Sequence, residues 1–178
     1  MGRLILVTGG ARSGKSDYAL QLAQWLPGPR CFIATCPVVD SEMDERIVRH
    51  REERAGTEWQ TVEEQIDIAA VIRIRRNDHV CLIDCLTLWV NNLLYRAEQS
   101  GEIFSDTEMR QQCDLLTEAA AAHRGAVICV TNEVGMGIVP DNPAARLYRD
   151  LVGRCNRMVA AAASEVYLVS CGIPLRLK

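Results

Sequence analysis

The fold of this chain is decided by the stretch LILVTGGARSGKS at residues 4–16. Its four leading apolar residues predict a buried strand, and the pattern G-x-x-x-x-G-K-[ST] that follows is typical of a phosphate-binding loop, or P-loop, that opens a helix. The glycines allow the backbone to approach phosphate oxygens closely, and the helix N-terminus favours bound anions. We expect Lys15 to bridge the β- and γ-phosphates and the Ser16 hydroxyl to bind Mg²⁺. The pattern thus predicts a nucleoside triphosphate site formed by Gly9, Gly10, Ala11, Arg12, Ser13, Gly14, Lys15 and Ser16.

Further apolar runs alternate with amphipathic stretches along the rest of the chain. The expected strands cover residues 31–35, 80–84, 126–131, 166–169 and 173–177, and the expected helices cover 16–25, 41–54, 86–94, 106–123 and 143–163. Continuously apolar strands that alternate with helices are typical of a parallel sheet covered on both faces. We therefore predict an α/β fold, namely a three-layer P-loop NTPase-type domain with a mostly parallel sheet and a RecA-like arrangement, in which residues 1–178 form a single domain.

Composition narrows the possible partners and the compartment. The chain has 178 residues, 48% of them hydrophobic, and a formal net charge of −3, so it lacks the basic footprint of a nucleic-acid-binding protein. No segment is long and apolar enough to predict a membrane span, and the N-terminus does not resemble a signal peptide. The eight cysteines form no CxxC pair. We interpret them as reduced thiols, and we predict a cytoplasmic protein with no nucleic-acid partner.

Asp84 ends the apolar run at residues 80–83. A carboxylate at the end of a buried strand near a P-loop is the arrangement that binds Mg²⁺ directly or through water. The alternative is that Asp84 is an ordinary cap of the helix that follows. Ligands bind at the carboxyl ends of strands in such sheets, and this favours the metal interpretation.

The charged helix expected at 41–54 carries His50. At helical spacing, His50 shares a stripe with Met43 and Ile47, which is consistent with a histidine at the edge of the core. Neutral imidazole can also attack phosphorus and form a covalent phosphoramidate. The spacing alone leaves both interpretations open.

Several blocks beyond the P-loop carry a more specific signal. They read FIAT at 32–35, DCLTLW at 84–89, TNEVG at 131–135, GIVP at 137–140 and GIP at 172–174. Together with LVTGGARSGKS at 6–16 and with His50, they resemble the family of bifunctional adenosylcobinamide kinases/adenosylcobinamide-phosphate guanylyltransferases of cobalamin assembly. The blocks run from one end of the chain to the other, so the resemblance is more specific than the P-loop alone.

The resemblance implies two reactions. ATP or GTP first phosphorylates the hydroxyl of adenosylcobinamide, and GTP then donates GMP to that phosphate, which yields adenosylcobinamide-GDP and pyrophosphate. In the family a histidine carries GMP between the half-reactions, and His50 matches it, although Arg49 stands where many members have a second histidine. The resemblance further implies Mg²⁺, a corrinoid acceptor, a homotrimer, and nucleotide contacts by Ala34, Thr35, Cys36, Arg51, Arg54, Glu63 and Asp84.

Three matters stay open at this point. Glu133 lies just before a Gly-rich loop, where it either meets the acceptor or caps the turn. The chain could also be a P-loop kinase of another small metabolite, with His50 structural, or a nucleotide-dependent regulatory ATPase without an acceptor. His79 and His123 are expected to be ordinary surface or boundary residues.

Overall fold

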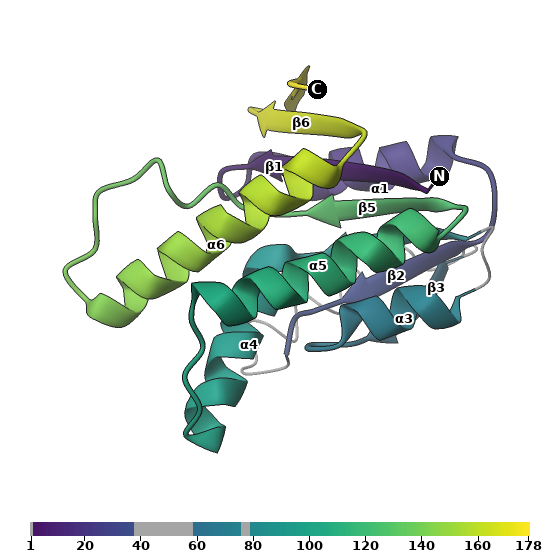
Figure 1. The fold of residues 1–178 in the computed structure, drawn as a ribbon. Helices are drawn as coiled ribbons and strands as arrows, with labels where there is room; N and C mark the ends of the chain where they lie inside the picture. The colour runs from purple at the N-terminus through teal and green to yellow at the C-terminus, as the bar shows by residue number, and fades with distance from the viewer. Residues whose placement is uncertain (1, 38–58, 76–78) are drawn as a thin grey trace.

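The computed structural model describes residues 2–37, 59–75 and 79–178. Figure 1 shows the elements of this part of the chain in space. The strands are β1 Arg3–Gly9, β2 Arg30–Ala34, β3 Trp59–Glu63, β4 Val80–Asp84, β5 Ala126–Val130, β6 Glu165–Ser170 and β7 Ile173–Arg176. The helices are α1 Lys15–Trp25, α3 Ile68–Ile74, α4 Leu86–Ser100, α5 Asp106–Ala122 and α6 Pro143–Ala162.

The seven strands form one sheet in the order β3-β2-β4-β5-β1-β6-β7. All neighbouring strands are parallel except β6 and β7, which form an antiparallel hairpin. The strand β5 separates β1, which leads into the P-loop, from β4, which ends at Asp84. The prediction of a mostly parallel sheet with a RecA-like arrangement is thus confirmed.

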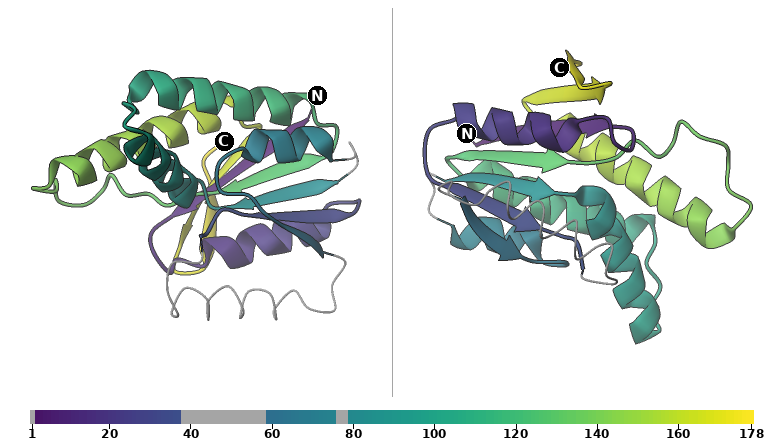
Figure 2. Two further views of the ribbon diagram at one scale, coloured as in Figure 1. Left: turned by 90° about the horizontal axis from the view of Figure 1, so that it is seen from below. Right: turned by 180° about the vertical axis from the view of Figure 1, so that it is seen from behind.

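Side-chain alternation along the strands builds two hydrophobic layers. Leu4 and Leu6 of β1 join a buried cluster with α3, α4, α5 and α6, whereas Ile5 and Val7 join a second cluster with α1 on the other face. Figure 2 (left) shows α1, in purple, on one face of the sheet and α3, α4, α5 and α6 on the other. Because both faces are covered, the central strands are apolar throughout, as the sequence pattern indicated.

Local signals account for the helix ends that were predicted well. The side chains of Ser105 and Glu108 form a capping box at the start of α5. Asn142 caps α6 through the backbone N–H groups of residues 144 and 145, and Pro143 occupies the first helical position. Such signals depend only on neighbouring residues, so they can be read directly from the sequence.

Two elements were not predicted. The edge strand β3 is exposed or half-buried at every position, so it lacks the apolar run used to find the other strands. Helix α3 has only seven residues. The helix predicted at 41–54 lies outside the described residues.

The expectation for His123 was wrong. Its side chain is only 2% exposed, and its Nε2 lies 2.8 Å from the carbonyl oxygen of His79. This contact joins the end of α5 to the start of β4, which draws the ring into the interior.

All eight cysteines are in the described residues and are free thiols, of which six are buried. Within the same residues, no helix combines the length and hydropathy that crossing a membrane requires.

Candidate nucleotide-binding site

The P-loop follows β1 at the carboxyl edge of the sheet and leads into α1. Gly14 occupies the N-cap position of α1 with φ 87° and has no side chain to cap the helix. The first N–H groups of α1 are therefore left for an external acceptor, which is the arrangement that binds phosphate. The N–H of Ser13 donates to the carbonyl of Gly10 (3.3 Å), and this bond closes the loop.

Two glycines of the P-loop pack closely against the β6–β7 hairpin. A Cβ on Gly9 would lie 2.4 Å from the carbonyl oxygen of Val169, and one on Gly14 would lie 3.1 Å from the Cα of Gly172. The N–H of Gly172 donates to the carbonyl of Ser13 at 2.8 Å. The hairpin thus supports the loop from one side, and no pattern in the sequence indicated this contact.

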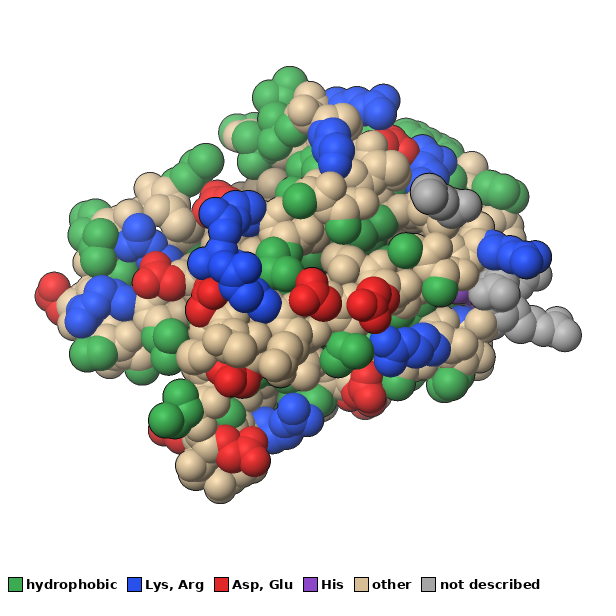
Figure 3. Space-filling model, viewed as in Figure 1, with side chains coloured by type: hydrophobic (Ala, Val, Ile, Leu, Met, Phe, Trp, Pro, Cys, Tyr) green, Lys and Arg blue, Asp and Glu red, His purple; other side chains and the backbone are tan. Residues whose placement is uncertain are grey.

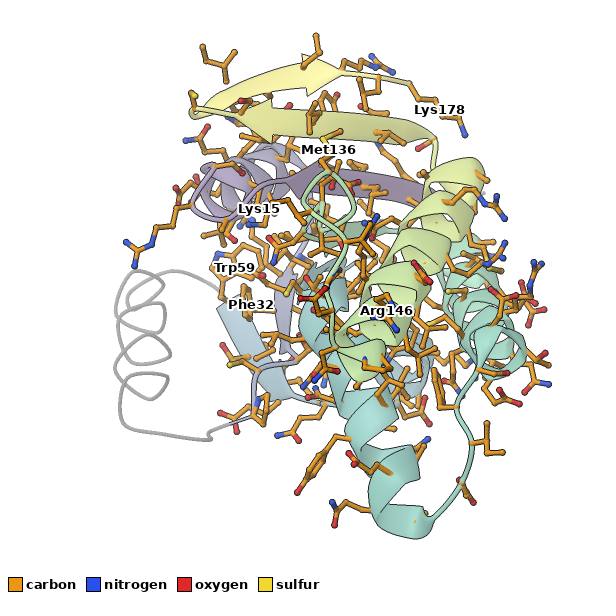
Figure 4. The ribbon with its side chains drawn as sticks, turned by 90° about the vertical axis from the view of Figure 1, so that its left-hand side faces the viewer. Lys15, Phe32, Trp59, Met136, Arg146 and Lys178 are labelled. Carbon is orange, nitrogen blue, oxygen red and sulfur yellow. The ribbon has the colours of Figure 1, made fainter. Side chains whose placement is uncertain are left out.

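Lys15, the first residue of α1, turns back over the loop. Its Nζ donates to the carbonyl of Gly10 at 3.2 Å. Figure 4, which looks at the carboxyl ends of the strands, shows Lys15 between the β6–β7 hairpin on one side and Phe32 and Trp59 on the other. An ammonium group held at the loop by a single backbone carbonyl can move onto phosphate oxygens when they bind.

Asp84 lies at the carboxyl end of β4, in register with Val130 of β5. The residue at the N-cap of α4 is Cys85, so Asp84 is not the cap of that helix. Burial raises the pKa of the Cys85 thiol to about 11, the charge of Asp84 raises it as well, and the charge of Lys15 acts in the opposite direction. The charges of Asp84 and Lys15 thus act in opposite directions on the same buried thiol.

Thr35 is fully buried and has its hydroxyl occupied by the backbone of Cys85. The hydroxyl donates to the carbonyl of Cys85 (2.8 Å) and accepts from its N–H (2.7 Å), while the Asn92 amide donates to the carbonyl of Thr35 (2.7 Å). These bonds hold the end of β4 beside the end of β2. The structure gives the Thr35 side chain this supporting task, and its contact with the nucleotide stays a prediction.

The other predicted nucleotide contacts lie on the far side of β4 from the P-loop or outside the described residues. Ala34 and Cys36 are half-buried at the end of β2, and Glu63 is exposed at the end of β3 beyond them. The predicted nucleophile and its arginines, His50, Arg51 and Arg54, lie outside the described residues.

Glu133 caps the turn that follows β5. Its carboxylate accepts from the N–H of Gly135 at 2.7 Å, as one of the two interpretations expected, and its own N–H donates to the carbonyl of Gly9 at 3.0 Å. Contact between Glu133 and an acceptor stays a prediction. The second bond nevertheless places the start of the loop at residues 134–140 directly beside the P-loop.

A network that sequence reasoning missed joins β5 to α4 and α6. The Thr131 hydroxyl donates to Asn156 Oδ1 (2.7 Å), and Asn156 Nδ2 donates to the carbonyl of Asn132 (3.1 Å). The N–H of Asn132 donates to the Thr87 hydroxyl (3.3 Å). The block TNE at 131–133 is therefore anchored on both sides, and only the spatial proximity of α6 reveals this role.

The loop at 134–140 exposes apolar side chains, with Met136 84%, Ile138 96% and Val139 59% exposed. Figure 3 shows hydrophobic side chains, with charged ones between them, where this loop lies in Figure 1, and a further group at the end of α4. A cavity of about 690 Å³ lies between α4 and α6, lined by residues that include Leu94, Tyr95 and Tyr148. An apolar surface of this kind suits a bulky, partly apolar ligand or another protein surface.

The site combines a phosphate loop, which enters α1 without a side-chain cap, with Asp84 at the end of a strand one position beyond β5. Together these features define a P-loop nucleotide-binding protein. The folds agree: a prototypical ATPase of a bacterial type III secretion system aligns with TM-score 0.63 and 15% identity, over 99% of this chain and 57% of that one. A protein of Pyrococcus horikoshii OT3 aligns with TM-score 0.57 and 8% identity, over 99% of this chain and 86% of that one.

The particular family is shown by sequence. The chain belongs to the family described as cobinamide kinase / cobinamide phosphate guanyltransferase, whose model matches residues 5–177. It is 40% identical to the bifunctional adenosylcobalamin biosynthesis protein CobU of Salmonella typhimurium LT2, over 98% of this chain and 99% of the relative. It is 41% identical to CobU of Escherichia coli K12 over the same shares, and 36% identical to CobP of Pseudomonas aeruginosa over 97% and 96%. The family expected from the resemblance is therefore confirmed.

Proposed function

We propose that this protein phosphorylates adenosylcobinamide with a nucleoside triphosphate and then transfers GMP from GTP to the adenosylcobinamide phosphate, as a step of cobalamin biosynthesis. The family match over residues 5–177 carries this conclusion. The P-loop supplies the triphosphate site that both reactions need, and the named relatives are bifunctional biosynthetic proteins.

In the kinase reaction, the acceptor hydroxyl oxygen attacks the γ-phosphorus, the bond to the β-phosphate oxygen breaks, and the nucleoside diphosphate leaves. The hydroxyl proton is released to solvent. The N–H groups at the start of α1 and the ammonium of Lys15 hold the β- and γ-phosphates in line. Because the start of the loop at 134–140 is bonded to Gly9, we place the acceptor on the side of the P-loop where Glu133 and Met136 lie.

In the guanylyl transfer, an imidazole nitrogen of His50 attacks the α-phosphorus of GTP and pyrophosphate leaves. A phosphate oxygen of the acceptor then attacks the same phosphorus, which forms adenosylcobinamide-GDP and regenerates His50. Lys15 and the loop N–H groups hold the departing pyrophosphate as they hold the β- and γ-phosphates in the first reaction. The same P-loop thus serves both reactions, and His50 is needed only for the second.

The Ser16 hydroxyl and the Asp84 carboxylate are oxygen ligands of the kind that Mg²⁺ prefers, and Asp84 does not cap α4. We propose that these two residues hold Mg²⁺. Bound there, the ion would neutralise charge on the β- and γ-phosphates. The homotrimer that the family resemblance implies and the cytoplasmic location that the composition indicates also stay predictions. Light scattering on the purified protein tests the oligomeric state.

Incubation with Mg²⁺ and α-labelled GTP tests the guanylyl step. We expect the protein to retain a label that acid removes and alkali does not, and the His50→Ala variant to retain none. The matched control is His79→Ala. His79 precedes β4 and so lies at the amino-terminal ends of the parallel strands, whereas the P-loop lies at their carboxyl ends. Absence of label on the unsubstituted protein would leave two interpretations, a P-loop kinase without guanylyl transfer and a regulatory ATPase.

Labelling from γ-labelled ATP tests the kinase step separately. Transfer of label to adenosylcobinamide, abolished by Lys15→Ala, supports the proposed acceptor. Slow hydrolysis that adenosylcobinamide neither consumes nor stimulates would instead support a regulatory ATPase.

A further inference from the structure

The segment that follows β5 continues its pairing with β1 at the carboxyl edge of the sheet. The N–H of Thr131 donates to the carbonyl of Val7 at 3.0 Å. The N–H of Glu133 donates to the carbonyl of Gly9, the first residue of the P-loop, at the same distance. Because β5 lies between β1 and β4, the intervening residue, Asn132, lies between the P-loop and the acidic end of β4.

The side chain of Asn132 lies on the face of the sheet that α1 covers. Side chains alternate between the two faces along β5 and its continuation. Cys129 belongs to the hydrophobic cluster that α6 joins, and Thr131 bonds Asn156 of α6. Val130 belongs to the cluster with α1 on the other face. Asn132 follows the alternation of Val130, so its side chain projects on the side to which the P-loop leads.

The backbone of Asn132, and not its side chain, anchors the residue. Its N–H donates to the Thr87 hydroxyl at 3.3 Å, and its carbonyl accepts from Asn156 Nδ2 at 3.1 Å. The Thr87 hydroxyl also lies 3.1 Å from the Sγ of Cys85, the residue that follows Asp84. The position of Asn132 is therefore set independently of its amide group.

The Oδ1 atom of Asn132 is buried and has no hydrogen-bond partner in the part of the chain that the structure describes. A buried acceptor without a partner destabilises a fold, so such a group in a native protein calls for an explanation. The neighbouring side chains are occupied within the protein, since Thr131 donates to Asn156 and Glu133 accepts from the N–H of Gly135. Asn132 thus presents an acceptor that an incoming donor can satisfy.

The chemistry of this atom identifies the donor. An amide oxygen only accepts hydrogen bonds, so its partner must bring a proton. The phosphate oxygens of a nucleoside triphosphate are themselves acceptors, whereas the hydroxyl that attacks the γ-phosphorus carries a proton. Because Glu133 bonds Gly9, this hydroxyl was placed above on the side of the P-loop where Asn132 also lies.

We propose that Asn132 Oδ1 accepts a hydrogen bond from the attacking hydroxyl of adenosylcobinamide and so aligns its oxygen with the γ-phosphorus. This inference rests on the proposed function, which supplies the hydroxyl. The bond from the hydroxyl oxygen to the γ-phosphorus forms as the bond to the β-phosphate oxygen breaks. A neutral amide does not take up the proton, which passes to solvent, so Asn132 orients the nucleophile without deprotonating it.

The two transfer reactions differ in their need for this contact. In the guanylyl transfer the attacking atom is a phosphate oxygen, which is ionised near neutral pH and has no proton to donate. Asn132 is therefore needed for the kinase reaction alone, as His50 is needed for the guanylyl transfer alone.

Steady-state kinetics of both reactions on the full chain test the inference. The substrates are γ-labelled ATP with adenosylcobinamide, and α-labelled GTP with adenosylcobinamide phosphate. We expect Asn132→Ala to lower kcat of the kinase reaction by about a hundredfold, the effect of a poorly positioned nucleophile, and to leave the KM for ATP unchanged. Guanylyl transfer should keep the rate of the unsubstituted protein. The melting temperature should be unchanged or higher, because the backbone bonds remain and an unpaired buried oxygen is removed.

Asn156→Ala is the contrasting variant, because it removes both side-chain bonds that anchor residues 131 and 132. It should lower the melting temperature and slow both reactions. The inference would be overturned if Asn132→Ala behaved in the same way, since the side chain would then support the fold or Lys15 rather than the hydroxyl. Full kinase activity of Asn132→Ala would overturn it as well. An unsubstituted protein that does not phosphorylate adenosylcobinamide would overturn the proposed function itself, and the inference with it.

Discussion

Gly9→Ala provides a direct test of how the hairpin supports the P-loop. Gly9 pairs with Val169 in the parallel ladder between β1 and β6. An added Cβ would lie 2.4 Å from the Val169 carbonyl oxygen and 2.6 Å from the Ser13 hydroxyl oxygen. Because the first of these atoms is backbone, β1 and β6 must separate before the methyl group fits.

Overpacking of this kind costs about 1–3 kcal/mol of the free energy of unfolding. In a chain of this length, each kcal/mol corresponds to roughly 2–4 °C in the melting temperature. We therefore expect Gly9→Ala to melt about 2–12 °C below the unsubstituted protein when no nucleotide is present.

Thermal unfolding followed by circular dichroism measures this difference. Gly10→Ala is the matched control, because a Cβ at Gly10 would have no heavy atom within 4 Å. We expect it to melt with the unsubstituted protein. Equal melting temperatures for Gly9→Ala and Gly10→Ala would refute the argument, because Gly9 would then be needed only for phosphate contact.

Two further predictions concern charge. Hydrogen bonds from Arg110 and Arg154 hold the pKa of Asp106 below its ordinary value. The carboxylate therefore stabilises the fold at pH values above the ordinary pKa of about 4. This contribution is lost as the pH falls through the lowered pKa. Asp106→Asn should therefore lower the melting temperature near neutral pH and not in acid; a difference independent of pH would contradict this. The hydrogen bond that Tyr167 donates to Glu165 raises the pKa of Tyr167 to about 12. Glu165→Gln should therefore lower the pKa of this tyrosine, followed by ultraviolet titration, toward about 10. An unchanged titration would show that the bond is not made in solution.

The strands and helices that could be predicted from the sequence are those whose bounds are determined by neighbouring residues. The strand at 80–84 has the predicted bounds, and the helix starts at 106 and 143 agree with the structure because caps and apolar runs are formed by neighbouring residues. Strand β3 was missed because an exposed edge strand is stabilised by pairing with β2, and that pairing leaves no apolar pattern in its own residues.

The candidate site divides in the same way. The P-loop could be predicted because its expected phosphate-binding groups belong to consecutive residues, and Asp84 could be singled out because it directly follows an apolar run. The nucleotide and Mg²⁺ contacts of both stay predictions. The bonds of Thr35 to Cys85 and of Asn156 to Thr131 join residues 50 and 25 positions apart in the sequence. Nothing in the sequence near either residue indicates its partner.

The sequence alone therefore determined the strand–loop–helix unit at residues 4–16, its capacity for a triphosphate and, through blocks spread along the chain, the family. The tertiary structure decided that β5 lies between the P-loop strand and Asp84 and that the turn at Gly172 packs against Gly14. The reason is physical: phosphate is bound by adjacent backbone groups, whereas the order of strands and the approach of two glycines about 160 residues apart depend on how the whole sheet assembles.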